Sequence, residues 1–250
     1  MNALNRHPFA VRAYFDKVAA VSFAFPTEVL RPLVSEGLEI DDYEGLGFVT
    51  VAMVWTKKLR PAVFPEMFGQ DFFLGGYRVF TRLRDESGRR LRGLQILRSE
   101  TDKARMVRSG NLLTKYHYRK VDVEISSAEN ETRVLTKLPS GEPTLDLTFD
   151  TTDGAAIPEG SPFPDWRTAR RFAGPMPFTF SRNDDGSFVV IEGSRASWSP
   201  RPVTVKHWNV GLFSEPAFAG VKPILANAFV VEDVDYRWEK GRIVRPGGVA

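Results

Sequence analysis

The chain has 250 residues, of which 42% are hydrophobic and 26% are charged, and its formal net charge is +3. These values are ordinary for a globular protein, and a chain of this length can bury a large core, so we expect a single domain over residues 1–250. It contains no cysteine, which excludes disulfides, thiolate nucleophiles and cysteine metal sites.

The first predicted elements lie between residues 26 and 54. Thr27 can cap a short helix that ends near Gly37. Residues 38–40 and 47–54 are typical of strands, and the second is a nearly continuous apolar and β-branched run that indicates burial on both faces. Residues 57–76 contain two prolines, three glycines and many aromatic side chains, which predicts a long irregular loop. Such a loop is usually functional or a lid.

A hairpin and the clearest helix signal follow. Strands are expected over 77–84 and 89–97, joined by a turn with favourable residues. Residues 99–102 resemble a capping box, so we expect a helix from there to Gly110, which can adopt the left-handed stop conformation. Residues 116–125 alternate in the manner of a strand, with the apolar side chains on one face.

The second half of the chain predicts more short strands. They cover 131–138, 144–149, 178–182, 187–192, 203–210 and 228–238, with a surface loop over 150–165 and a short helix over 166–172. Many short strands with regular turn signals and few helices indicate an α+β domain, mostly antiparallel β, built on a curved sheet or barrel.

Lys115 is the main candidate for chemistry. Extending the strand alternation back from Val121 places Lys115, His117 and Arg119 on the core-facing side. A desolvated lysine is a nucleophilic amine, His117 could transfer protons near neutral pH, and Arg119 could hold a carboxylate. The alternative is a strand that begins later and leaves Lys115 and Arg119 solvated, because boundaries inferred from sequence err by several residues.

Arg78, Glu66 and Tyr116 are further candidates for ligand binding. Arg78 begins a strand after the aromatic segment and could clamp an anionic ligand, or form a structural ion pair. Glu66 lies among apolar residues and could be a proton donor of raised pKa, or a solvated loop acid. Tyr116 follows Lys115 directly and is counted with Arg78, Glu66 and Arg119 as a substrate-binding candidate.

Charge, hydropathy and motifs limit the expected partners. The net charge is small and arginines are interleaved with acids, so no nucleic-acid partner is expected. The first eight residues contain no apolar signal region, and no apolar run approaches the roughly 20 residues of a membrane helix. We therefore expect a cytoplasmic protein with a small-molecule ligand and no membrane partner, and we leave homo-oligomer formation open.

Metal and cofactor sites are not expected either. The three histidines, His7, His117 and His207, lack the spacing of metal ligands, and no cysteine supplements them. Nucleophile elbows, glycine-rich phosphate loops and dinucleotide fingerprints are all missing from the sequence. The sequence therefore predicts no metal site and no bound cofactor.

Several segments resemble the acetoacetate decarboxylase-like superfamily. Residues 29–41 and 48–53 are similar to a signature region of the decarboxylases. Residues 97–102, 110–118 and 234–238 look closer to a bacterial branch of that superfamily known as a domain of unknown function. The resemblance implies a cone-like open β-barrel with a few flanking helices around an internal pocket.

The resemblance also implies candidate chemistry. Decarboxylases of this superfamily form a Schiff base between a buried lysine and a β-keto acid, and a second lysine lowers the pKa of the first. Aligned on that pattern, Lys115 falls on the second lysine and Thr114 on the first, whereas a shift by one residue makes Lys115 the nucleophile. Val49 stands where one catalytic glutamate is expected, and Glu66 matches the other only with a small insertion. These departures argue against acetoacetate decarboxylation.

Two functions therefore stay open. The first is a lyase- or hydrolase-type enzyme in which Lys115 and His117 are catalytic and the substrate is a small anionic or carbonyl-containing metabolite. The alternative is a non-catalytic β-barrel that binds such a metabolite in its pocket.

Overall fold

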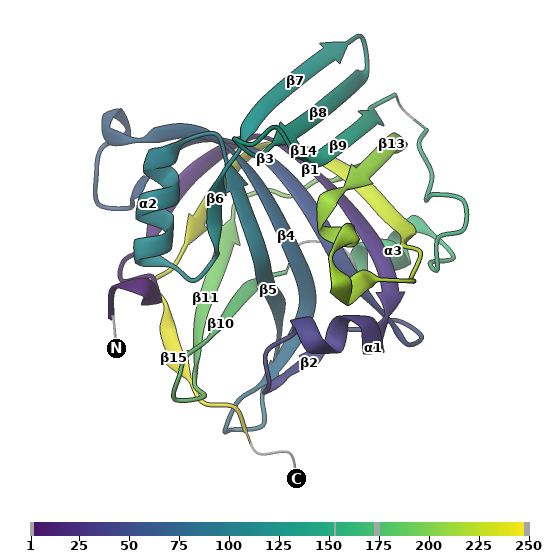
Figure 1. Ribbon diagram of the computed structural model, residues 1–250. Helices are drawn as coiled ribbons and strands as arrows, with labels where there is room; N and C mark the ends of the chain where they lie inside the picture. Colours follow the sequence, from purple (N-terminus) through teal and green to yellow (C-terminus); the bar gives the residue numbers. More distant parts are fainter. Residues whose placement is uncertain (1–2, 153, 173–175, 248–250) are drawn as a thin grey trace.

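Long strands curl into a closed ring. The computed structural model describes residues 3–152, 154–172 and 176–247. The ring runs in the order β14 (Ile224–Trp238), β1 (Val11–Pro26), β3 (Leu46–Pro61), β4 (Gln70–Arg84), β5 (Arg90–Thr101), β10 (Phe178–Arg182) and β11 (Phe188–Arg195), and β11 pairs back with β14. All of these pairings are antiparallel except the one between β5 and β10. The predicted class, a mostly antiparallel α+β barrel, is confirmed (Figure 1).

A second, smaller sheet packs on the outside of this ring. It has the order β13 (Thr204–Val210), β9 (Pro143–Asp150), β8 (Glu131–Lys137) and β7 (Asp122–Ala128). Val134 and Leu147 of this sheet share one hydrophobic core with Val51, Met53 and Tyr77 of the ring. Figure 1 shows the smaller sheet rising from one end of the barrel.

The alternation of side chains along β3 explains its apolar composition. Val49, Val51 and Met53 face the second sheet, while Ala52 and Val54 belong to a different core, inside the ring. Both faces of this strand are therefore buried, as the continuous apolar run over 47–54 predicts.

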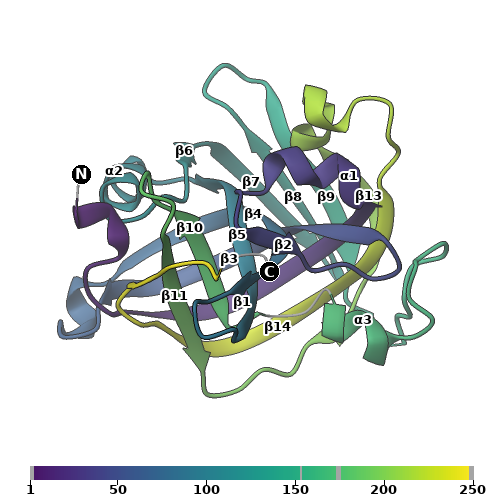
Figure 2. The ribbon, with the colours of Figure 1, turned by 90° about the horizontal axis from the view of Figure 1, so that it is seen from below.

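Short elements close the ends of the barrel and connect the strands. In Figure 2, α3 lies beside β14. Within the described residues, no helix has the length and apolar character needed to cross a membrane. The remaining elements are η1 (Ala3–Arg6), α1 (Thr27–Leu30), η2 (Arg31–Leu33), β2 (Leu38–Ile40), η3 (Glu66–Phe68), α2 (Ala104–Leu113), β6 (Tyr118–Lys120), α3 (Trp166–Phe172), β12 (Arg201–Pro202), η4 (Gly211–Ser214), η5 (Pro216–Phe218) and β15 (Arg242–Val244).

The predicted long loop over 57–76 is wrong for most of its length. β3 continues to Pro61 and β4 begins at Gln70, so only a short connection with η3 remains between them. Gly69 directly precedes β4 and packs tightly against β3, because a Cβ atom on it would lie 2.5 Å from the backbone of Lys58. Glycine here marks close packing rather than irregular backbone.

The predicted helix over 99–110 is displaced. Residues 99–101 end β5, and α2 begins at Ala104. Asp102 instead accepts a hydrogen bond from the backbone N–H of Phe73 at 2.8 Å, which holds the end of β5 against β4. Gly110 lies inside the helix, where the ring of Tyr118 packs so closely that a Cβ atom would overlap it.

The strand predicted over 116–125 is two strands. β6 pairs in parallel with β5, whereas β7 pairs with β8 in the second sheet. The buried Val121 lies between them. A single alternating segment therefore passes from one sheet to the other. β1 was not predicted, although residues 11–26 form a central strand that pairs with both β3 and β14.

A buried carboxylate joins the two sheets. Glu100 is 0% exposed, and its Oε1 accepts a hydrogen bond from Arg119 Nε at 2.9 Å. Its Oε2 accepts hydrogen bonds from the hydroxyls of Tyr77 at 3.1 Å, Thr144 at 2.9 Å and Thr136 at 3.3 Å. Because these partners come from β4, β6, β8 and β9, one side chain fixes the position of the second sheet on the ring.

We expect Glu100→Ala to lower the free energy of unfolding by roughly 3–5 kcal/mol, since breaking a buried ion pair leaves its partners unsatisfied. Equilibrium denaturation in urea measures this change. The control is Glu86→Ala in the exposed β4–β5 turn, for which we expect a change within about 0.5 kcal/mol. Equal effects of the two substitutions would show that Glu100 does not join the sheets.

Candidate functional site

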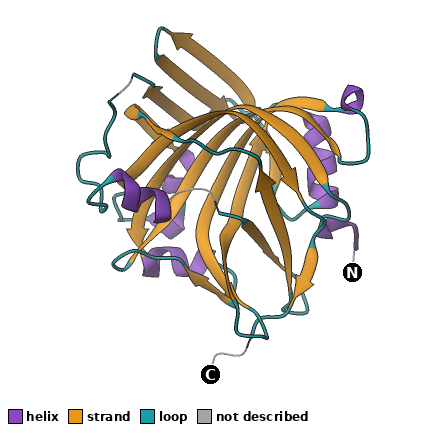
Figure 3. Ribbon diagram, turned by 180° about the vertical axis from the view of Figure 1, so that it is seen from behind, coloured by secondary structure: helices purple, strands orange, loops and turns teal. Residues whose placement is uncertain are grey.

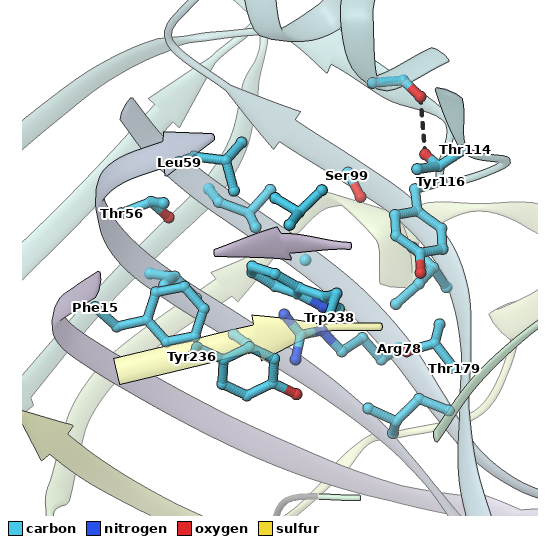
Figure 4. A pocket seen from close by; sticks show the side chains of 18 of the residues that line it. Phe15, Thr56, Leu59, Arg78, Ser99, Thr114, Tyr116, Thr179, Tyr236 and Trp238 are labelled. Carbon is cyan, nitrogen blue, oxygen red and sulfur yellow. Dashed lines mark hydrogen bonds between the residues drawn. The ribbon is translucent and has the colours of Figure 1, made fainter. Parts of the chain in front are cut away.

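The interior of the barrel contains a cavity of about 330 Å³. Alternate residues of β4 line it from Gln70 to Phe80, so the cavity follows the strand through the barrel. One end lies at residues 7–9, Pro61 and Leu113, and the other at Phe80, Leu94 and Met176. Figure 4 shows side chains from several strands converging on this space.

Arg78 is the charged group in the middle of the cavity wall. Its Nε atom is buried and has no hydrogen-bond partner, and no described acid forms an ion pair with it. The chain makes room for the guanidinium at Gly76, where a Cβ atom would lie 3.0–3.1 Å from its nitrogens. A β-bulge at this point changes the register between β4 and β5, because Tyr77 pairs with Arg98 but Arg78 pairs with Ile96.

The described residues around Arg78 provide no compensating negative charge. Burial lowers the pKa of Arg78, and the neighbouring Tyr236, Tyr118 and Tyr116 act in the opposite direction and raise it. Burial in turn raises the pKa of each of these phenols, so they stay neutral at physiological pH. The arginine remains charged in any protein environment. The cavity therefore holds a cation without a counterion.

Unsatisfied polar atoms concentrate around this cavity. Among the described residues, seven buried side-chain nitrogen or oxygen atoms lack a hydrogen-bond partner, and five of them belong to residues that line it. The five are His7 Nδ1, Thr56 Oγ1, Arg78 Nε, Tyr116 Oη and Trp198 Nε1. Buried polar groups are normally paired, so a cluster of unpaired ones indicates a place for a polar ligand or water.

An aromatic cluster forms one wall of the cavity. The ring of Tyr236 lies 5.0 Å from that of Phe15 and 4.6 Å from that of Trp238, measured between ring centres. Arg195 lies 4.9 Å above the ring of Trp198 and also lines the cavity. The wall therefore offers a large apolar surface beside the cation of Arg78 (Figure 4).

His7 lines the end of the cavity near the N-terminus. Its backbone N–H donates to the carbonyl of Leu113 at 2.9 Å, which ties the N-terminal segment to the end of α2. The residue is buried with a backbone φ of 53°. Burial lowers the pKa of His7 below its ordinary value, which keeps the ring neutral at physiological pH.

Lys115 and His117 do not line the cavity. Lys115 Nζ donates to the carbonyl of Arg182 at 2.9 Å and to Oδ1 of Asn183 at 3.1 Å, in the β10–β11 turn. His117 is exposed and has a φ of 52°. The predicted core-facing position of both residues fails because β6 begins only at Tyr118, so the strand alternation does not extend back to 115. The strand therefore begins later than Lys115, which is the alternative that the sequence left open.

The other candidates divide between the cavity and structural ion pairs. Arg78 and Tyr116 line the cavity together, as does Thr114. Arg119 instead pairs with the buried Glu100. Glu66 is exposed in η3, where a hydrogen bond from Lys58 at 2.7 Å lowers its pKa, opposite to the predicted rise. The structure therefore brings two of the six predicted site residues to the cavity.

Several cavity residues were missed from the sequence. Arg195 is the last residue of β11 and Trp198 follows it, and neither carries a local pattern that points to a pocket. Tyr236 and Trp238 could have been found, because they alternate along the predicted strand over 228–238 and so share one face. His7 precedes the first strand, and nothing in its neighbourhood predicts its burial.

We expect Arg78→Met to leave the free energy of unfolding unchanged or to raise it by about 1–3 kcal/mol, because it removes an unpaired buried polar group. The matched control is Arg119→Met, which leaves Glu100 without its cation and should destabilise the protein. Denaturation of both variants in the absence of ligand measures the contrast. A large loss of stability in Arg78→Met would show that Arg78 is a structural residue.

Acidification should cost stability through His7. The unfolded chain binds a proton at the ordinary histidine pKa of 6.5, whereas the folded protein binds it only at lower pH. Unfolding therefore takes up a proton in this range, and stability falls as the pH drops below that value. His7→Asn suits the left-handed backbone and should lose less in melting temperature between neutral pH and about pH 5. Parallel losses in both proteins would contradict this assignment.

Comparisons with known proteins agree with the barrel. The model of the DUF2071 family, an uncharacterized conserved protein, matches residues 12–232. No curated protein matches the chain. Acetoacetate decarboxylase from Legionella pneumophila has a TM-score of 0.64 and 11% identity over 96% of this chain and 88% of that one.

Two further solved structures have the same fold. The enduracididine biosynthesis enzyme MppR, complexed with pyruvate, has a TM-score of 0.61 and 10% identity over 94% of this chain and 90% of that one. An acetoacetate decarboxylase-like enzyme from Sphingomonas wittichii RW1 has a TM-score of 0.61 and 11% identity over 96% of this chain and 94% of that one. The chain therefore belongs to the DUF2071 family, and its fold is that of the acetoacetate decarboxylase-like superfamily.

Proposed function

We propose that the protein binds a small apolar carboxylic acid, without a covalent bond, inside the barrel. The observation that carries this proposal is the guanidinium of Arg78, which faces the cavity without a counterion among the described residues. A buried charge is costly unless it is paired. A carboxylate ligand supplies that pair, and the planar fork of arginine donors matches its two oxygens.

The composition of the cavity wall supports an anion with an apolar body. Among the described lining residues, the charged side chains are three arginines, and none is an aspartate, a glutamate or a lysine. Phe15, Phe72 and Trp238, with aliphatic side chains between them, make most of the wall apolar. Burying the hydrocarbon part of a ligand against such a wall contributes about 25 cal/mol per Å².

The unpaired polar atoms favour a ligand rich in hydrogen-bond acceptors. Trp198 Nε1 and Arg78 Nε are hydrogen-bond donors only. Burial raises the pKa of Tyr116, so its hydroxyl keeps its proton and can also donate. Carboxylate and carbonyl oxygens satisfy donors of this kind. The pyruvate bound to MppR is a carboxylate in a barrel of the same fold, which supports the same ligand class here.

The geometry favours binding over Schiff-base chemistry. A Schiff base needs a lysine amine beside the substrate carbonyl. Lys115 Nζ is held by two acceptors in the β10–β11 turn, and a lyase that used it would have to break both hydrogen bonds and turn the side chain into the cavity. We therefore assign no catalytic step to Lys115 or His117.

We expect octanoate and 3-phenylpropionate to bind at least tenfold more tightly than the primary alcohols of the same skeletons, because a hydrogen bond to a charged group contributes about 1.5–3 kcal/mol. Trp198 and Trp238 line the cavity, so their fluorescence reports the binding. Arg78→Met should abolish the preference for the acid over the alcohol while keeping the fold.

Lys115→Met is the control and should bind these acids as the natural protein does. Borohydride added in the presence of pyruvate should give no covalent adduct by intact mass. Equal affinity for acids and alcohols would overturn the proposal, and an adduct that disappears in Lys115→Met would replace it with a Schiff-base function.

A further inference from the structure

Exposed apolar side chains gather at one end of the barrel. Ten large hydrophobic side chains are exposed in the described part of the chain, and seven of them lie within residues 3–10, 57–71 and 102–113. We call these three segments the mouth collar. The seven are Leu4, Phe9, Val63, Phe64, Met67, Phe68 and Leu112. Scattered exposed apolar residues are normal, whereas a concentration in one place indicates an interaction surface.

The mouth collar surrounds one end of the cavity. All three segments contribute lining residues, among them Phe9, Pro61 and Leu113. Backbone hydrogen bonds join the segments, from His7 to Leu113 at 2.9 Å and from Ala62 to Ala10 at 2.8 Å. Figures 1 and 3 show η1, α2 and the connection that carries η3 on the same side of the barrel.

The connection between β3 and β4 forms an apolar tip. Val63 is 85% exposed and Met67 is 83% exposed, and the ring centres of Phe64 and Phe68 lie 6.3 Å apart. The single charged residue in this tip, Glu66, pairs back with Lys58 at 2.7 Å and with Arg60 at 3.6 Å. The tip therefore presents hydrocarbon and aromatic surface outward, with its one carboxylate neutralised by the strand behind it.

The mouth collar is also basic. It contains seven basic and three acidic residues, a net charge of +4, whereas the whole chain carries +3. Lys58, Lys103, Arg105 and Arg108 are exposed in it. An apolar tip inside a basic surround is complementary to a surface that is hydrocarbon beneath and negatively charged on top.

We infer that the mouth collar docks on the surface of an anionic lipid bilayer. Val63, Phe64, Met67 and Phe68 enter the interfacial region, and the surrounding lysines and arginines face the lipid phosphates. A second copy of the chain is a poorer occupant, since a two-fold contact would oppose two surfaces of charge +4. The sequence predicted no membrane partner because it has no long apolar run. That observation concerns crossing a bilayer, and it does not concern docking on the bilayer surface.

This inference goes beyond the proposed ligand and does not require it. Docking places this end of the cavity against the phase in which apolar acids concentrate. A ligand could then pass between bilayer and cavity without crossing water.

The cysteine-free chain allows a direct test with a single label. Met67→Cys carries an NBD fluorophore in the tip, and Ile125→Cys carries it on the exposed face of the second sheet as the matched control. With vesicles of equal parts phosphatidylcholine and phosphatidylglycerol, we expect the emission at position 67 to rise about two-fold or more and to shift to the blue. Position 125 should not change, and phosphatidylcholine alone should give a weak response.

Charge reversal tests the basic surround. Arg105→Glu with Arg108→Glu should reduce sedimentation with anionic vesicles at least tenfold, because each basic residue near such a surface contributes about 1 kcal/mol. Arg89→Glu with Arg90→Glu makes the same charge change in the β4–β5 hairpin and should have little effect. Equal responses at positions 67 and 125, or an emission change at 67 that depends on protein concentration without vesicles, would overturn the inference. Octanoate binding in vesicle-free buffer is measured separately, so failure of docking and failure of the proposed function are distinguishable.

Discussion

The strands of the ring must bury both of their faces, and the rest of the structure depends on this constraint. One face closes around the cavity and the other carries the second sheet, so successive residues belong to different environments. On β4, Tyr77 reaches the Glu100 network while its neighbour Arg78 faces the cavity. The bulge in the β4–β5 pairing shifts the alternation of β5, where the lining residues pass from Leu94 and Ile96 to Ser99, whereas β4 alternates without interruption.

Buried charges have different surroundings inside and outside the cavity. Outside the cavity, Glu100 is surrounded by an arginine and three hydroxyl groups, and Asp41 is likewise held by Arg82 and Arg92. Inside, Arg78 Nε has no hydrogen-bond partner, and no acid in the described part of the chain pairs with the guanidinium. This contrast in the pairing of buried charges is the physical basis for the proposal that Arg78 binds the carboxylate of a ligand.

Much of the fold was predictable, but the site was predictable only in part. Alternation and turn residues identified most strands because these signals are local. They failed at the glycines near residues 69–76, where close packing was mistaken for a loop, and at Lys115, where the strand start lay three residues further on. Arg78 and Tyr116 were found from the sequence, whereas His7 and Trp198 reach the cavity only through contacts between segments far apart in the chain. Long-range packing of this kind leaves no local pattern.

The pairing of β1 with β14 has a consequence for the order in which the molecule can assemble. These strands lie near opposite ends of the chain, and Val11 is paired with Trp238. During synthesis, β1 can pair with β3 early, but its other edge waits until almost all of the polypeptide has emerged. The interior therefore closes last, and such non-local pairing makes folding slow. A nascent or truncated chain that lacks β14 exposes the apolar interior of the barrel, and such exposed surface favours aggregation until the last long strand is made.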